Sequence, residues 1–213
     1  MDILKAEKYP IIGIISMKNT GKSVMVKHLT KQYRLLKKFD IAYCFCNTCE
    51  LNTDYDYLPN KYVINNVNET IIHQIMSKQV EKIKSKKDIK NILFIFDDVM
   101  GDINLKKSGI LQTLFTQNRQ YRISIIVSVQ QLSSVLPPYV RNNVSSYIFS
   151  KNNKTNIECI YNETEYNGSI KQFINFVHTH CIDYYFMVYT KGVTNNSFFK
   201  IKANLNENLK INY

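Results

Sequence analysis

Short apolar runs alternate with amphipathic stretches along most of this chain. The first run is IIGIIS at 11–16, and the stretch after it places Val24, Leu29 and Leu36 on one helical face. Apolar residues at helical spacing indicate an amphipathic helix, and a short continuous run bounded by turn residues is typical of a buried strand. The pattern therefore predicts a strand, a loop and a helix in that order.

A longer apolar run, NILFIFDD at 91–98, follows a predicted helix over 69–86. An uninterrupted run of this kind is typical of a strand that is buried on both faces of its sheet. The same alternation continues to the end of the chain. The other predicted elements are strands at 41–47, 61–67, 123–129, 146–150, 184–190 and 197–203, helices at 105–118 and 169–180, and a Pro-Pro turn at 137–138.

Strands that alternate with helices indicate an α/β fold of three layers, in which a mostly parallel sheet is covered by helices on both faces. No repeat and no Gly-, Ser- or Pro-rich linker divides the 213 residues. We expect one domain over 1–213, with its core motifs in 9–151 and the elements of 152–213 completing it. The apolar runs are shorter than the roughly 20 residues that span a bilayer, and the first residues lack a signal-peptide pattern. We therefore expect an intracellular protein with no membrane partner.

The segment ISMKNTGKS at 15–23 ends in the Gly-Lys-Ser of a phosphate-binding loop. Backbone N–H groups at a helix start bind phosphate oxygens, the lysine neutralises them, and the hydroxyl ligates Mg²⁺. Ser16 stands where the usual pattern has its first glycine, and it can form the turn if its dihedral angles stay in an allowed region. We predict a nucleoside-triphosphate site with Mg²⁺ on Ser23. The predicted nucleotide contacts are Ser16, Met17, Lys18, Asn19, Thr20, Gly21, Lys22, Ser23 and Val24.

Two aspartates end the apolar strand at 91–98. Adjacent acids at a buried strand end are costly unless a cation or water uses them. We predict that Asp97 holds Mg²⁺, generally through water, and that Asp98 activates the water that attacks the nucleotide. The alternative interpretation is a solvated loop after the strand.

A third candidate is the polar end of the strand at 123–129. Gln130 is the residue best placed to contact the γ-phosphate or its water, with Gln131 as its competitor. Arg119, before this strand, and Arg141, after the turn, are candidates for an arginine finger, which often comes from a neighbouring subunit. We expect Arg119 at the edge of the sheet that carries the nucleotide. The alternative for either arginine is an ordinary surface position.

The net positive charge of the chain indicates what kind of partner it binds. The 28 lysines and arginines exceed the 17 acids by 11, which makes a polyanionic partner plausible. Six of the lysines lie in KQVEKIKSKKDIK at 78–90, either as the solvated face of a helix or as a surface that tracks DNA.

The five cysteines are an odd number, and we expect free thiols. A zinc site is the alternative, although C-x-C-x₂-C is not a standard ligand spacing. Its ligands would come from two groups about 130 residues apart, namely Cys44, Cys46 and Cys49 with His178, His180 and Cys181.

The order of these motifs resembles the genome-packaging ATPases of large DNA viruses, the poxvirus-type branch of the FtsK–HerA superfamily of P-loop motors. The matching segments are ISMKNTGKS, ILFIFDDVM, NRQYRISIIVSVQQ and LPPYVRNN. The resemblance implies a sheet of the RecA-like (ASCE) type. It also implies that Lys22 and Ser23 bind phosphate and Mg²⁺ and that Asp97 and Asp98 form the acidic pair. Gln130 would then be the sensor and Arg119 the arginine finger. The family's usual Gly and His around that arginine are Asn118 and Gln120 here.

By this resemblance the protein is an ATPase that translocates double-stranded DNA and packages a viral genome into the capsid. Its partners are then DNA, its own copies in a homo-oligomeric ring, and a viral capsid or portal-like component. It would act at a cytoplasmic assembly site in the infected host cell, with the virion as a further location. Two alternatives stay open: a P-loop nucleotide kinase, and a non-hydrolysing nucleotide-dependent switch that binds a capsid partner.

Overall fold

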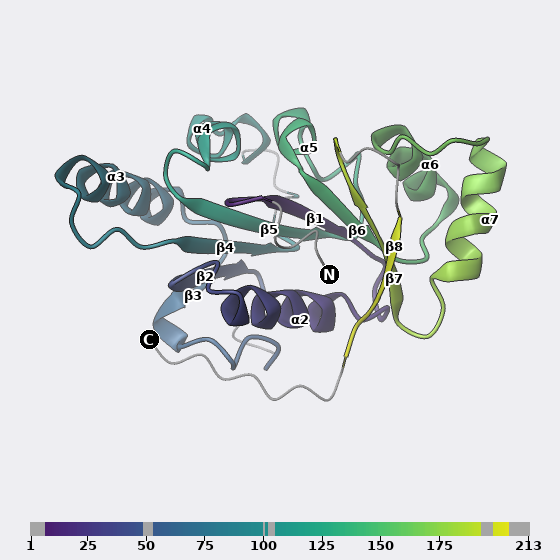
Figure 1. Ribbon diagram of the computed structural model, residues 1–213, viewed down its shortest axis with the longest axis horizontal. Helices are drawn as coiled ribbons and strands as arrows, with labels where there is room; N and C mark the ends of the chain where they lie inside the picture. The colour runs from purple at the N-terminus through teal and green to yellow at the C-terminus, as the bar shows by residue number, and fades with distance from the viewer. Residues whose placement is uncertain (1–6, 49–52, 100, 102–104, 193–197, 205–213) are drawn as a thin grey trace.

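The structure is a computed structural model that describes residues 7–48, 53–99, 101, 105–192 and 198–204. Within these residues the strands form a single sheet (Figure 1). The strands are β1 Ile11–Ile15, β2 Ile41–Cys46, β3 Val63–Asn65, β4 Ile92–Asp97, β5 Ile123–Val129, β6 Ser146–Phe149, β7 Tyr185–Thr190 and β8 Phe199–Lys202. The helices are α2 Lys22–Leu35, α3 Glu69–Ser85, α4 Gly109–Gln117, α5 Pro138–Asn143, α6 Lys154–Glu163 and α7 Ile170–His180, with short 3-10 turns at Asn60–Tyr62 and Leu105–Lys107.

The strand order in the sheet is β3-β2-β4-β5-β1-β6-β7-β8. The six strands from β3 to β6 are parallel, and β7 and β8 are antiparallel to their neighbours. β5 lies between β4 and β1, so the strand with the two aspartates is not a direct neighbour of the strand before the phosphate loop. The predicted α/β fold with a mostly parallel central sheet is confirmed.

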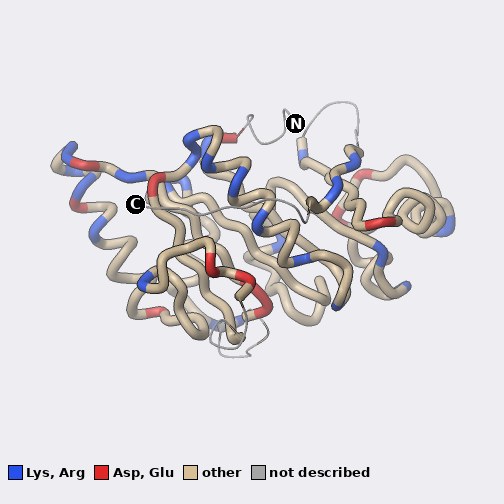
Figure 2. Tube along the Cα trace, turned by 90° about the horizontal axis from the view of Figure 1, so that it is seen from below, with Lys and Arg blue, Asp and Glu red and all other residues tan. Residues whose placement is uncertain are grey.

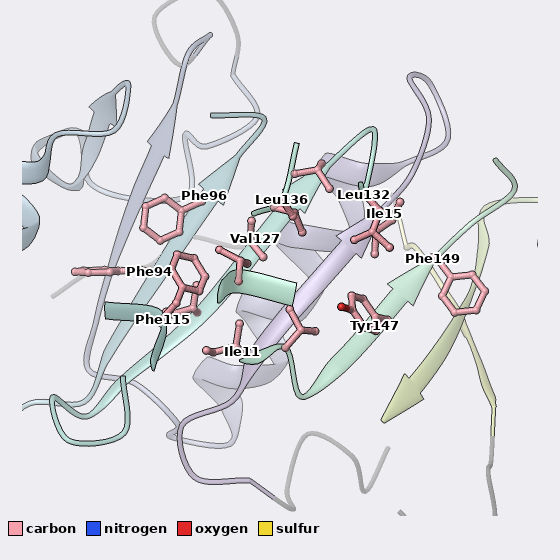
Figure 3. Packing of buried hydrophobic residues seen from close by; sticks show 14 of the residues in the cluster. Ile11, Ile15, Phe94, Phe96, Phe115, Val127, Leu132, Leu136, Tyr147 and Phe149 are labelled. Atoms are coloured by element: carbon pink, nitrogen blue, oxygen red, sulfur yellow. The ribbon is translucent and has the colours of Figure 1, made fainter. Parts of the chain in front are cut away.

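Helices cover both faces of the sheet (Figure 1). One hydrophobic cluster lies between the sheet and α3 to α7, and ten of its residues, among them Phe94, Phe96 and Tyr147, are labelled in Figure 3. A second cluster lies between the sheet and α2 and includes Met25, Val26 and Leu29. Strands β4 and β5 contribute to both clusters, which explains their uninterrupted apolar sequences.

Helix starts follow the chemistry of the capping residues. The side chains of Asn68, Ser108, Asn153 and Ser169 accept backbone hydrogen bonds at the starts of α3, α4, α6 and α7. The N-cap of α2 is Gly21, which has no side chain to accept such bonds. The first N–H groups of α2 are therefore available to an anion.

Two helices and one strand differ from the sequence-based expectations. The Pro-Pro pair is not a simple turn, because Pro138 is the first residue of α5, a position that its fixed φ angle favours. Helix α6 was not predicted, although Asn153 caps it and Ile157 and Ile160 share its buried face. The strand expected over 61–67 is reduced to β3, because residues 60–62 form a 3-10 turn.

Candidate nucleotide-binding site

The connection between β1 and α2 has the backbone of a phosphate loop. Asn19 and Gly21 have left-handed φ angles of 64° and 90°, whereas Ser16 is not among the residues with positive φ. The turn that a first glycine usually permits is therefore made with Ser16 in an allowed region, as the sequence required.

Ser16 uses its hydroxyl to hold the loop. This buried side chain hydrogen-bonds to the hydroxyls of Thr20 and Ser150, the latter at 2.7 Å between the two Oγ atoms. The Thr20 hydroxyl also donates to the carbonyl of Met17 at 2.6 Å. Because Ser150 follows β6, these bonds tie the loop to the neighbouring strand.

Lys22 lies against both predicted acids. Its ammonium contacts Asp98 Oδ2, and its distance to Asp97 Oδ1 is 3.8 Å. The buried Ser128 donates a hydrogen bond to Asp97 Oδ1 from the adjacent strand. Asp98 has a left-handed φ of 53°, which aspartate tolerates better than most residues. The solvated-loop alternative for these acids does not describe Asp97, whose side chain is 11% exposed.

Gln130 joins this cluster and Gln131 does not. The amide of Gln130 donates to Asp98 Oδ2 at 3.0 Å, and its backbone carbonyl accepts from Asn156 of α6 at 2.7 Å. Gln131 instead accepts a hydrogen bond from Ser134. Of the two residues that competed for the sensor position, Gln130 has the predicted placement.

A cavity of about 440 Å³ opens above the loop. It is lined by Met17, Lys18, Asn19, Gly21, Lys22, Ser23, Val24, Asp54, Asp98 and Gln130. Of the predicted loop contacts, Ser16 and Thr20 are not in this lining. They support the loop through the hydroxyl bonds described above.

Sequence reasoning missed three residues around this site: Asp54, Tyr55 and Ser128. Asp54 lines the cavity from the segment after β2. Burial raises the pKa of the Tyr55 hydroxyl well above its usual value, and the nearby Cys44 and Asp97 raise it further. None of the three stood out in the sequence, because only the order of β2, β4 and β5 in the sheet brings Tyr55 and Ser128 to Asp97, and the segment of Asp54 to the cavity.

The expected position of Arg119 is wrong. Arg119 precedes β5, and β5 is parallel to β1, so Arg119 lies at the amino-terminal edge of the sheet and the phosphate loop at the other. Its guanidinium pairs with Glu7, which precedes β1, and its side chain is 73% exposed. The seven residues of β5 separate Arg119 from the nucleotide edge by about 20 Å at the rise of a parallel strand.

Arg141 is also remote from the loop. Its guanidinium donates to the carbonyl of Leu136 at 3.2 Å and pairs with Glu163 at 3.1 Å. Tyr147 and Lys191 contact the same carboxylate at 3.1 and 3.4 Å. These bonds tie α5, β6 and α6 together within the chain.

The two groups of potential zinc ligands lie on different elements of the fold, one in β2 and the other at the end of α7. Cys44 and Cys46 are buried in β2, whereas Cys181 is buried at the end of α7. Four strands lie between β2 and β7 in the sheet order. No group of three potential ligands is found in the described part of the chain, and Cys49 lies outside it. The described cysteines are free thiols, and burial raises the pKa of Cys181 to about 11.

The described helices include none with both the length and the apolar character of a bilayer-crossing segment.

Comparison with known proteins finds a protein family that matches this chain. The family model described as Poxvirus A32 protein matches residues 2–203. A curated relative, the uncharacterized protein 075L of Invertebrate iridescent virus 6, is 26% identical over 164 residues. That match covers 76% of this chain, which spans 62% of the relative's length.

Solved structures share the fold. The genome packaging NTPase B204 from Sulfolobus turreted icosahedral virus 2, in complex with ATP-gammaS, matches with a TM-score of 0.64 and 16% identity. The match covers 92% of this chain and 98% of that one. The pCW3 conjugation coupling protein TcpA matches with a TM-score of 0.61 and 16% identity, over 95% of this chain and 61% of that one. The fold of this chain is therefore that of P-loop ATPases.

Proposed function

This chain belongs to the Poxvirus A32 protein family, and from that premise we propose that it is an ATPase that translocates double-stranded DNA and packages a viral genome into its capsid. The observation that carries the proposal is the convergence of Lys22, Asp98 and Gln130 on one cavity at the start of α2. This arrangement combines a phosphate-binding cation, a carboxylate and a polar sensor.

Each residue has a role that follows from its place. Lys22 and the N–H groups at the start of α2 would bind the β- and γ-phosphates. Asp98 would accept the proton of the attacking water, and Gln130, which donates to Asp98 at 3.0 Å, would hold that water in line. Ser128 would fix the orientation of Asp97 through the hydrogen bond to Oδ1.

The residues at this site fit Mg²⁺. Ser23 and Asp97 supply a hydroxyl and a carboxylate, the hard oxygen ligands that this ion prefers, and Lys22 already places a positive charge 3.8 Å from Asp97. When bound, Mg²⁺ would neutralise charge on the phosphates. Asp97 of β4 and Ser23 of α2 would hold it.

Three partners belong to the proposal: double-stranded DNA, further copies of the chain in a ring, and a capsid or portal-like component. The family is viral, which supports action in an infected host cell. Within that cell we propose a cytoplasmic assembly site, with the virion as a further location. The net charge of +11 supports DNA binding. Figure 2 shows lysines and arginines spaced along α2 and around the end of α3.

The lysines at the end of α3 are partly neutralised within the chain. Lys82 and Lys90 pair with Asp88 at 3.3 and 3.0 Å, and hydrogen bonds from these two lysines lower the pKa of Asp88. This pairing favours a solvated face over a DNA-tracking surface.

We also propose a single domain over 1–213. The described part of 152–213 contributes α6, α7, β7 and β8, and β7 pairs with β6 in the same sheet. Asn156 of α6 contacts Gln130 directly. These contacts support one folding unit for the motifs and the elements that follow them.

The test is steady-state release of phosphate from ATP by the purified protein, with and without duplex DNA. We expect turnover that duplex DNA stimulates and that Lys22→Ala abolishes. Turnover that depends on an added nucleoside monophosphate would identify a kinase instead. ATP binding without turnover above that of Lys22→Ala would identify a nucleotide switch.

A further inference from the structure

The turn that leads into β7 has an unusual backbone beside the phosphate loop. The carbonyl of Ile182 accepts a hydrogen bond from the N–H of Tyr185 at 2.9 Å, and the two residues between them, Asp183 and Tyr184, have φ angles of 51° and 64°. Positive φ at both central positions defines a type I′ turn, which glycine, asparagine and aspartate dominate. A tyrosine there is an outlier that costs free energy and persists only where the surroundings fix it.

The ring of Tyr184 lies against the phosphate loop. A β-carbon built on Gly21 would be 3.1 Å from Cδ1 of Tyr184, close enough to require movement of the ring. The N–H of Ala203, just after β8, donates to the carbonyl of Tyr184 at 3.0 Å and fixes the turn from the other side. In Figure 1 the connection between β1 and α2 lies beside the adjoining ends of β7 and β8.

Tyr184 is nevertheless half exposed. Its exposed fraction is 50%, so part of the ring remains free for a further contact. The ring of the next residue, Tyr185, is already in contact with cations. The ammonium groups of Lys200 and Lys202 lie 4.2 and 5.2 Å from its centre. The turn thus presents an accessible aromatic surface next to Gly21, which lines the nucleotide cavity.

We propose that Tyr184 forms the base-binding subsite of this nucleotide site, with its ring stacked on the base of the bound nucleoside triphosphate. This inference rests on the proposed function. A nucleotide whose phosphates lie at the start of α2 carries its ribose and base out of the phosphate loop, and Tyr184 is fixed at the glycine that ends that loop. Stacking on an aromatic side chain tolerates any base and stabilises binding about tenfold or more per base.

The chain contains no tryptophan, which makes a direct test possible. Tyr184→Trp introduces a single indole, and its fluorescence is followed during titration with ATP and with inorganic tripolyphosphate, which has no base. Calorimetry measures binding of both ligands. We expect ATP to quench the emission strongly and tripolyphosphate to bind with little change. Phe199→Trp, an exposed position at the far end of the same β7–β8 pair, is the control and should respond to neither ligand.

Affinities of two further variants complete the test. Tyr184→Ala should raise the dissociation constant for ATP about tenfold and leave that for tripolyphosphate unchanged, and Tyr184→Phe should restore ATP affinity. ATP binding without quenching in Tyr184→Trp would overturn the subsite. An equal loss of affinity for ATP and for tripolyphosphate in Tyr184→Ala would show instead that the ring only holds the phosphate loop at Gly21 in place. Failure of both ligands to bind the unmodified protein would overturn the proposed function and the subsite with it.

Discussion

Asp98 accepts hydrogen bonds from two groups that the proposed reaction needs. Lys22 contacts its Oδ2, and Gln130 donates to the same atom at 3.0 Å. The two donors hold the carboxylate at the cavity, and its left-handed backbone turns it away from the strand direction that Asp97 keeps. Adjacent aspartates therefore have distinct environments, which suits distinct roles in metal binding and water activation.

Asp98→Asn tests the role of the base. Asparagine tolerates the left-handed φ of 53°, so the backbone should be unchanged. We expect ATP affinity to stay within about threefold, because Lys22 and Asp97 remain, and turnover to fall about 10²- to 10⁴-fold, the usual contribution of a general base. Equilibrium binding and phosphate release measure the two quantities.

Asp54 provides the matched control, since its side chain lines the same cavity. Asp54→Asn should keep most of the turnover. If Asp54→Asn loses turnover and Asp98→Asn keeps it, the base is Asp54 and the assignment from the acidic pair is wrong.

Asn118 connects three elements at the amino-terminal edge of the sheet. This buried residue ends α4, and its amide donates to the carbonyls of Tyr9 and Ile123, both at 2.8 Å. The family's usual glycine at this position could not make these bonds. The departure at Asn118 is therefore a structural feature that joins α4, the residues before β1 and the start of β5.

Asn118→Ala should lower the free energy of unfolding by about 2 kcal/mol, because two buried carbonyls lose their donor. Denaturant titration measures this change. Gln120→Ala, two residues on at an exposed position, is the control and should change it by less than about 0.5 kcal/mol. Equal effects of the two substitutions would refute the connecting role of Asn118.

Elements with a clear apolar period could be predicted from the sequence. The β1–loop–α2 unit and β4 were predicted because a buried strand and an amphipathic helix have distinct patterns. Helix α5 was not, since it has six residues and begins at a proline, and α6 was not, since only Ile157 and Ile160 form the apolar part of its buried face. In the site, Lys22, Asp98 and Gln130 belong to motifs, whereas Tyr184 reaches Gly21 only through the antiparallel pairing of β7 with β6, which no local pattern indicates.

Arg119 and the phosphate loop lie at opposite edges of the sheet, which leads to a prediction about neighbouring subunits. The guanidinium lies at the edge of the sheet opposite the phosphate loop of the same chain, and its side chain is 73% exposed. If Arg119 is a finger, it must therefore act on the nucleotide of a neighbouring subunit. Such residues contribute about 10³ to 10⁵ in rate in well-studied NTPases.

Arg119→Ala should reduce turnover by such a factor and leave ATP affinity nearly intact, while Arg122→Ala in the same turn should keep turnover. Mixing Arg119→Ala subunits with Lys22→Ala subunits should recover activity, because some interfaces then combine an intact phosphate loop with an intact arginine. No recovery in verified mixed assemblies would remove the finger role from Arg119.

Movement along duplex DNA is the central claim, and displacement of a third strand from a triplex measures it most directly. A labelled oligonucleotide bound to one end of a duplex is released when a motor arrives, so release reports translocation rather than hydrolysis. We predict release by the unmodified protein with ATP and Mg²⁺, and none by Lys22→Ala or with a non-hydrolysable analogue. Steady DNA-stimulated hydrolysis that leaves the third strand in place would contradict the account.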